Sequence, residues 1–168
     1  DEFDKTFLKL EPNIICINNI DGDHYDIYKD YDDLKNSFEQ FSKKLKNQGI
    51  LISNDKLDFE SINYGFNPKS NFVIKNLRFE FGYSIFDIYS ENLKYNEIYF
   101  NMIGKYNCVN ALAAIVIALK INIPIDLIRK GLNTFKGVKR RLSFELRKPK
   151  ILIDDYAHHP KEIDSVYT

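Results

Sequence analysis

Two segments of the sequence place carboxylate and imidazole side chains directly after an apolar run. The first, NNIDGDHYD, carries His24 and follows the run that begins at Ile14, and the second, DDYAHHP, follows the apolar residues 151–153. In open α/β sheets, ligands bind at the carboxyl ends of strands, and imidazole side chains ligate metals and transfer protons. Both segments are therefore candidate parts of a ligand site. An Asp-His pair alone is a weak signal, however, and a doubled histidine before proline more often caps a helix.

Charge is segregated along the sequence around these two segments. Residues 21–33 contain six aspartates against one lysine, and residues 136–150 contain seven basic residues against one glutamate. A metal-bound nucleotide needs carboxylate or imidazole for its cation and Lys or Arg for its phosphates, so the two runs could form one site. They could equally be two solvated loops.

Several common site motifs do not occur in the sequence. No H-E-x-x-H segment and no paired cysteine spacing is present, which disfavours a zinc hydrolase. The segment GKYN at Gly104 lacks the earlier glycine and the following Ser or Thr of a phosphate loop, and no G-x-G-x-x-G occurs. If the chain serves an ATP-dependent enzyme, its phosphate loop must lie elsewhere.

Composition excludes other classes of function. The 24 basic residues balance 24 acidic ones, so no net charge attracts the chain to nucleic acid or an anionic membrane. No apolar run approaches the ~20 residues of a membrane-spanning helix, and we expect a cytoplasmic protein. Cys16 and Cys108 lie in apolar stretches and are interpreted as buried thiols rather than a disulfide framework.

Hydrophobic periodicity predicts an α/β fold. Continuous apolar runs predict buried parallel strands, the 3.6-residue spacing of apolar residues predicts helices, and a β-rich region divided by turns predicts an antiparallel meander at one edge. The predicted strands are 13–20, 49–54 and 150–154, the meander is 72–81, 83–90 and 96–102, and the predicted helices are 32–46, 107–120 and 125–134, with a further helix starting at Pro160.

Five segments in order resemble the Mur ligase family, and most closely its alanine-adding branch. They are DEFDKTFLKLEPNI, NNIDGDHYDIY, GKYNCVNALAAI, FKGVKRR and DDYAHHPKEI, and together they span nearly the whole chain. The resemblance implies that residues 1–141 are the C-terminal part of a central ATPase domain. Residues 142–168 would then start a Rossmann-like C-terminal domain that binds the amino acid. We therefore expect a fragment that is inactive by itself.

The resemblance also implies a reaction. Family members form an amide with ATP and Mg²⁺ in peptidoglycan assembly, and this branch takes UDP-N-acetylmuramate and L-alanine as substrates. The muramyl carboxylate attacks the γ-phosphate to give an acyl phosphate, which the amine of the amino acid then attacks. A related ligase that recycles muropeptides, and a non-catalytic nucleotide-binding module, remain alternatives.

Three residues match family positions on the metal and adenine sides of the site. His24 matches the histidine ligand of a magnesium ion beside the reacting groups, although a loop histidine bonded to Asp26 is the alternative. Asn107 and Asn110 match an asparagine pair that contacts ATP, the second reading the adenine edge, although Asn107 could instead cap its helix. The chain departs from the family at Tyr106, where most members have histidine.

The remaining matches lie near the expected domain junction. Arg140 is assigned to the adenine side and Arg141 to the phosphates or ribose, although either could form an interdomain salt bridge. Asp155 matches an acceptor for the ribose hydroxyls and Tyr156 a neighbour of the base. His158 matches a position lining the L-alanine pocket.

Overall fold

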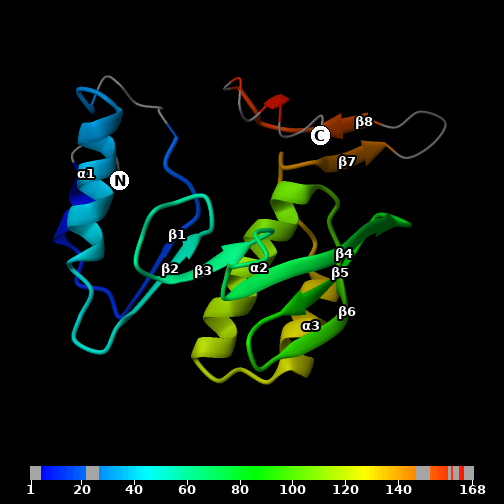
Figure 1. Ribbon diagram of the computed structural model, residues 1–168. Helices are drawn as coiled ribbons and strands as arrows, with labels where there is room; N and C mark the ends of the chain where they lie inside the picture. The colour runs from blue at the N-terminus through cyan, green and yellow to red at the C-terminus, as the bar shows by residue number, and fades with distance from the viewer. Residues whose placement is uncertain (1–4, 22–26, 147–151, 159, 161–162, 165–168) are drawn as a thin grey trace.

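The computed structural model describes residues 5–21, 27–146, 152–158, 160 and 163–164. Six strands form one mixed sheet in the order β1-β2-β3-β4-β5-β6, and two more form a separate small sheet (Figure 1). Strands β1 to β4 are parallel neighbours, whereas β4, β5 and β6 are antiparallel. The elements are η1 (Thr6–Lys9), β1 (Ile14–Ile17), α1 (Tyr31–Ser42), β2 (Ile50–Asn54), β3 (Ile62–Gly65), β4 (Phe72–Glu80), β5 (Tyr83–Tyr89), β6 (Lys94–Phe100), α2 (Lys105–Lys120), α3 (Ile125–Thr134), β7 (Ser143–Leu146) and β8 (Leu152–Asp154).

The first part of the sheet is a β1-α1-β2 unit with its own small core. Asp30 caps α1 by accepting a hydrogen bond from the Asp33 amide at 2.9 Å. Ile15 and Ile17 of β1 are buried in this core together with Leu34 of α1. Because successive strand residues face opposite sides, the intervening residues of β1 pack toward the larger core instead.

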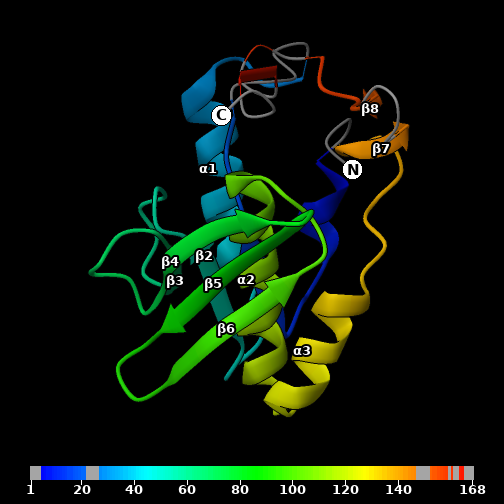
Figure 2. The ribbon, with the colours of Figure 1, turned by 90° about the vertical axis from the view of Figure 1, so that its right-hand side faces the viewer.

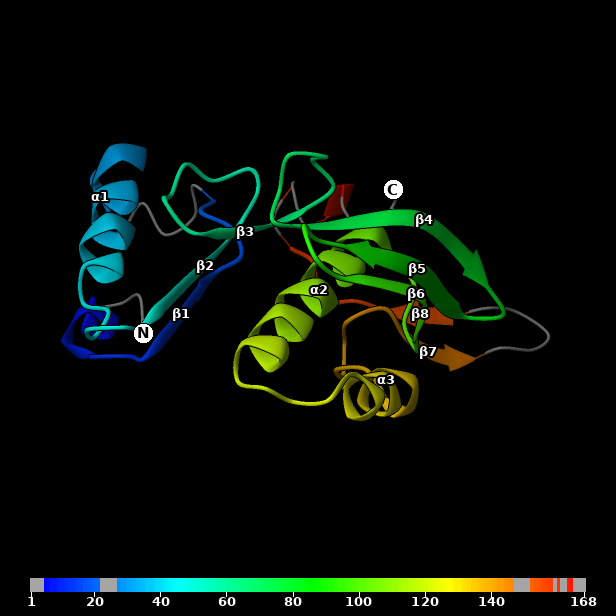
Figure 3. The same ribbon diagram turned by 60° about the horizontal axis from the view of Figure 1, so that its bottom comes forward.

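The larger core lies between the antiparallel part of the sheet and two helices. Figure 3 shows α2 and α3 against the same face of the meander β4-β5-β6. Helix α2 is apolar around most of its circumference, as expected of a buried helix, and Leu112 and Val116 are fully buried. Arg129 of α3 covers the outer edge of β6 by donating hydrogen bonds to the carbonyls of Asn96 and Glu97, both at 2.7 Å.

The C-terminal segment lies over the start of α2. Strands β7 and β8 form the antiparallel two-stranded sheet, which Figures 1 and 2 show above the N-terminal end of α2. Gly104, with φ of 105°, precedes α2, and a Cβ atom there would lie 3.2 Å from Leu142 Cδ1. A glycine at this point therefore allows the chain before β7 to approach the helix closely.

The α/β class, the parallel strands β1 and β2 and the antiparallel meander at the sheet edge are confirmed, and helix α3 has the predicted bounds. The strand predicted at 150–154 is observed as β8, but it pairs antiparallel with β7, and its Leu152 and Ile153 are exposed rather than buried. Strands β3 and β7 were not predicted. The helix predicted from Pro160 lies largely outside the described residues. Within the described ranges, no helix is both long and apolar enough to cross a membrane.

Candidate functional site

An open groove of about 1430 Å³ begins at the carboxyl ends of β1, β2 and β3 and continues between α2 and α3, where Ala118 and Leu127 line it. Its walls include residues that follow these strands, among them Asn18, Asp55 and Phe66, and residues from the first turns of α2. Lys105 contributes positive charge at this helix end, with its Nζ 4.8 Å from the centre of the Phe66 ring. One part of the groove therefore lies at the sheet edge where the sequence predicts a ligand site.

Asn107 and Asn110 both line the groove, but their side chains differ in environment. Asn107 is buried, and its Nδ2 donates a hydrogen bond of 2.8 Å to the carbonyl of Ile103. Asn107 thus fastens the segment that precedes α2, which differs from the capping role considered above. Asn110 is exposed three residues further along the helix. Its carboxamide has the donor and the acceptor that recognition of an adenine edge requires.

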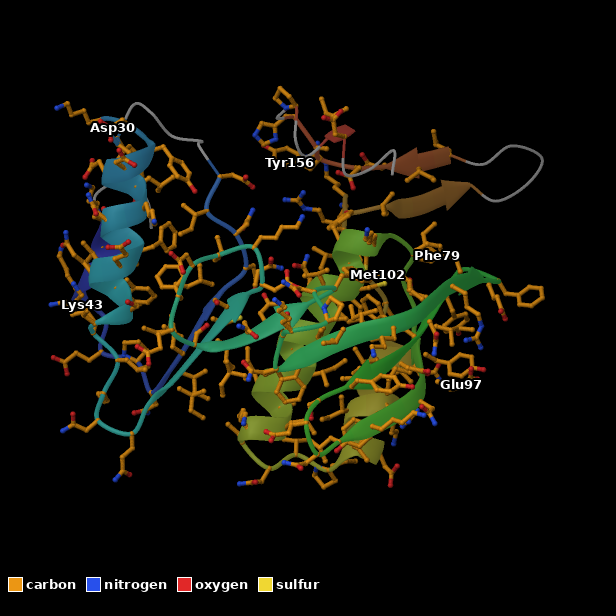
Figure 4. All side chains as sticks on the ribbon, viewed as in Figure 1. Asp30, Lys43, Phe79, Glu97, Met102 and Tyr156 are labelled. Carbon is orange, nitrogen blue, oxygen red and sulfur yellow. The ribbon has the colours of Figure 1, made fainter. Side chains whose placement is uncertain are left out.

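Arg140, Tyr156 and His158 form a stack beside the groove. The Arg140 guanidinium carbon lies 4.5 Å from the centre of the Tyr156 ring, and that ring meets the His158 ring at 5.0 Å in an edge contact. Arg140 Nε is also 3.8 Å from Oδ2 of Asp154, the last residue of β8 before the loop that carries Tyr156. Figure 4 shows Tyr156 above the starting end of α2. The expected junction residues therefore meet in one cluster.

Asp155 connects this cluster to the groove. Its Oδ2 accepts a hydrogen bond from the backbone amide of Leu142, and its Oδ1 accepts one from that of Ala157, both at 2.8 Å. The Tyr156 amide donates to the Arg140 carbonyl, also at 2.8 Å. Asp155 and Arg141 line the groove as well. Because each carboxylate oxygen can accept a second hydrogen bond, Asp155 can still bind a hydroxyl group.

The metal side of the predicted site cannot be placed in the same way. His24 lies outside the described residues. Within the part of the chain that the structure describes, no three His, Cys, Asp or Glu residues are grouped so as to hold a metal ion. The magnesium assignment therefore rests on the motif around His24 alone.

Sequence reasoning missed a polar cluster at one end of the groove. Asn18 Oδ1 accepts a hydrogen bond from Tyr64 Oη at 2.7 Å and one from Cys16 Sγ at 3.3 Å. Burial raises the pKa of Tyr64 far above its ordinary value, and the neighbouring Cys16 raises it further. Burial also raises the pKa of the Cys16 thiol. No short-range signal marks this cluster, because Tyr64 belongs to the four-residue strand β3, which was not predicted.

Curated relatives of the chain share one enzyme name. The chain is 45% identical over 99% of its length to UDP-N-acetylmuramate–L-alanine ligase of Flavobacterium psychrophilum, and 40% identical over 99% to the same enzyme of Christiangramia forsetii. It spans 38% and 37% of the lengths of these relatives.

Solved structures of Mur ligases share the fold. MurC of Thermotoga maritima, a UDP-N-acetylmuramate–alanine ligase, is similar with a TM-score of 0.84 and 25% identity over 99% of this chain and 40% of that one. MurF of Acinetobacter baumannii is similar with a TM-score of 0.81 and 22% identity over 95% of this chain and 37% of that one. The sequence also matches the Mur ligase middle domain over residues 3–118. The chain therefore belongs to the Mur ligase family.

Proposed function

We propose that this chain is the ATP-binding part of a ligase that joins L-alanine to UDP-N-acetylmuramate. The observation that carries the proposal is the groove at the strand ends, which brings Asn110, Arg141 and Asp155 from separate parts of the sequence to one surface. The names of relatives that are 36–45% identical supply the substrates. An enzyme that uses ATP and a UDP-linked sugar is expected in the cytoplasm, which is the location we propose.

Each groove residue has a task that suits its chemistry. Asn110 offers a carboxamide to the adenine edge, and Asp155 accepts a hydrogen bond from a ribose hydroxyl. Arg141 binds phosphate, for which its planar guanidinium provides two parallel donors. Asn107 supports this surface by holding the segment before α2. The adenine ring would lie next to Arg140 and Tyr156 and stack on the planar face of one of these side chains.

The proposed reaction proceeds in two steps. The muramyl carboxylate oxygen attacks the γ-phosphorus of ATP, the bond to the bridging oxygen breaks, and ADP leaves with an acyl phosphate remaining. The amine of L-alanine then attacks the acyl carbon and displaces inorganic phosphate, losing a proton to form the amide. His158 is assigned to the alanine pocket and His24 to magnesium, which would stabilise the charge on the phosphates.

A hybrid enzyme tests this function directly. The chain would replace the matching segment of the F. psychrophilum ligase, and phosphate release from MgATP and UDP-N-acetylmuramate would be measured with and without L-alanine. A thermal melt of each protein first establishes that the hybrid is folded. We expect release that depends on L-alanine. A folded hybrid that releases no phosphate would contradict the proposal, and a requirement for a peptide in place of L-alanine would favour the muropeptide-recycling reaction.

A further inference from the structure

The cluster of Cys16, Asn18 and Tyr64 joins the buried interior to the surface of the groove. Tyr64 is completely buried, whereas Asn18 is exposed and lines the groove. The Tyr64 hydroxyl and the Cys16 thiol both bond to one atom, Asn18 Oδ1, at 2.7 and 3.3 Å. The buried Tyr64 and the partly buried Cys16 therefore hold one end of an exposed carboxamide.

These contacts determine which end of the Asn18 carboxamide is available to a ligand. Because the pKa values of Tyr64 and Cys16 are both raised by burial, both groups stay protonated at neutral pH and can donate. Two donors occupy the acceptor sites of a carbonyl oxygen, which has two lone pairs. The Nδ2 group, which carries two hydrogens, lies at the other end of the carboxamide and remains the donor for a ligand.

We propose that Asn18 is a hydrogen-bond donor to an anionic oxygen bound in the groove, and that Tyr64 is the positioning residue that fixes its orientation. The ligand oxygen belongs to a phosphoryl group or to a carboxylate, the two anionic groups of the proposed substrates. Lys56 and Lys105 line the same groove and favour an anion there.

Nearby carboxylates are engaged with other groups. Asp21 accepts a hydrogen bond from Asn19 Nδ2 at 2.7 Å. Asp55 Oδ2 accepts one from the Asn67 amide at 2.7 Å and one from Ser70 Oγ at 3.2 Å. Their hydrogen bonds within the protein moderate the repulsion that these two groups exert on an anion.

The inference rests on the proposed function for the identity of the ligand and adds a residue to it. Binding of adenosine, which has no anionic group, distinguishes a failure of the proposed function from a failure of the inference about Asn18. Adenosine tests the adenine side at Asn110, whereas tripolyphosphate and N-acetylmuramate test the anionic side at Asn18. If the chain does not bind adenosine, this result counts against the proposed function but not against the inference about Asn18. If adenosine binds but neither anionic probe shifts the Asn18 Nδ2 signals, the inference about Asn18 fails while the adenine side of the proposed function stands.

The test titrates the chain with tripolyphosphate, N-acetylmuramate and adenosine in separate experiments, followed by ¹H–¹⁵N spectra that resolve side-chain amides. We expect the Asn18 Nδ2 signals to shift with tripolyphosphate if the ligand is phosphoryl, or with N-acetylmuramate if it is a carboxylate. Asn18→Asp keeps the size of the side chain but replaces the donor with a negative oxygen, so the affinity for that probe should fall at least about tenfold. Adenosine affinity should not change.

A double-mutant cycle tests the positioning role of Tyr64. Tyr64→Phe should weaken binding of the anionic probe about threefold to tenfold in the unmodified chain, and should have no further effect when Asn18 is already alanine. A general loss of stability would instead reduce binding equally in both backgrounds, and thermal melts of all four proteins would detect it. Equal effects in both backgrounds, or Asn18 signals that shift with neither anionic probe, would overturn the proposal.

Discussion

Replacing Asp155 by alanine should loosen the connection between the groove and the C-terminal loop. The carboxylate accepts two backbone hydrogen bonds of 2.8 Å, from Leu142 on one side and Ala157 on the other. A hydrogen bond to a charged group contributes about 1.5–3 kcal/mol. Because Asp155 is only partly buried, we take the lower end of that range for each of the two bonds and expect a total loss of about 3 kcal/mol in the local opening free energy.

Amide hydrogen exchange measures this loss at the two donors. At 1.36 kcal/mol for each factor of ten, about 3 kcal/mol corresponds to an exchange rate up to about 150-fold faster at the Leu142 and Ala157 amides. Asp154→Ala is a matched control, since it removes the adjacent carboxylate, which forms an exposed ion pair of 3.8 Å with Arg140. Such exposed pairs contribute about 0–1 kcal/mol. Equal exchange rates in the two variants would refute the assignment.

Three further predictions concern the core and the titrating groups. Leu112→Ala should lower the free energy of unfolding by about 3 kcal/mol in a urea titration, whereas Leu127→Ala, 59% exposed, should change it by under about 0.5 kcal/mol; similar losses would contradict the core assignment. Burial alone would raise the pKa of Asp87, but hydrogen bonds from Asn76 and the Glu97 amide lower it below 3.8. Its stabilising effect is therefore present above about pH 4 and is lost as the pH falls through the folded pKa, so Asp87→Asn should remove that part of the acid dependence; an unchanged acid-unfolding profile would contradict this. Burial raises the pKa of the Cys108 thiol to about 11, so folded protein at pH 8 should leave this thiol unmodified by a thiol reagent, and rapid labelling would contradict its burial.

Local patterns predicted the parts of the fold that depend on near neighbours. Helix α3 follows a proline and has regularly spaced apolar residues, so both of its ends were predictable. The β1-α1-β2 unit and the meander carry equally strong signals. Strand β3 has only four residues and takes its place by pairing with β2 and β4. Strand β7 likewise forms by pairing with β8. Such pairing depends on strands elsewhere in the fold, so a strand of four residues carries little local sequence signal.

The candidate site was predictable to a similar extent. The motif matches identified Asn110, Arg141 and Asp155, and the structure places all three on the groove. The matches assigned the adenine edge to Asn110, whose side chain is exposed, and left a helix cap as the alternative for Asn107. They did not predict that the Asn107 side chain bonds to the carbonyl of Ile103. The bond between Asn18 and Tyr64 joins residues 46 positions apart, so only the folded chain reveals it.

Binding of ATP to the chain tests the central claim most directly. The dissociation constant would be measured by titration calorimetry for the unmodified chain, for Asn110→Ala and for Asn92→Ala, an exposed asparagine in the turn between β5 and β6. We expect Asn110→Ala to weaken binding about tenfold, because it removes the donor and acceptor offered to adenine, and Asn92→Ala to have no effect. No measurable binding, or equal affinities for all three proteins, would contradict an adenine site in this groove.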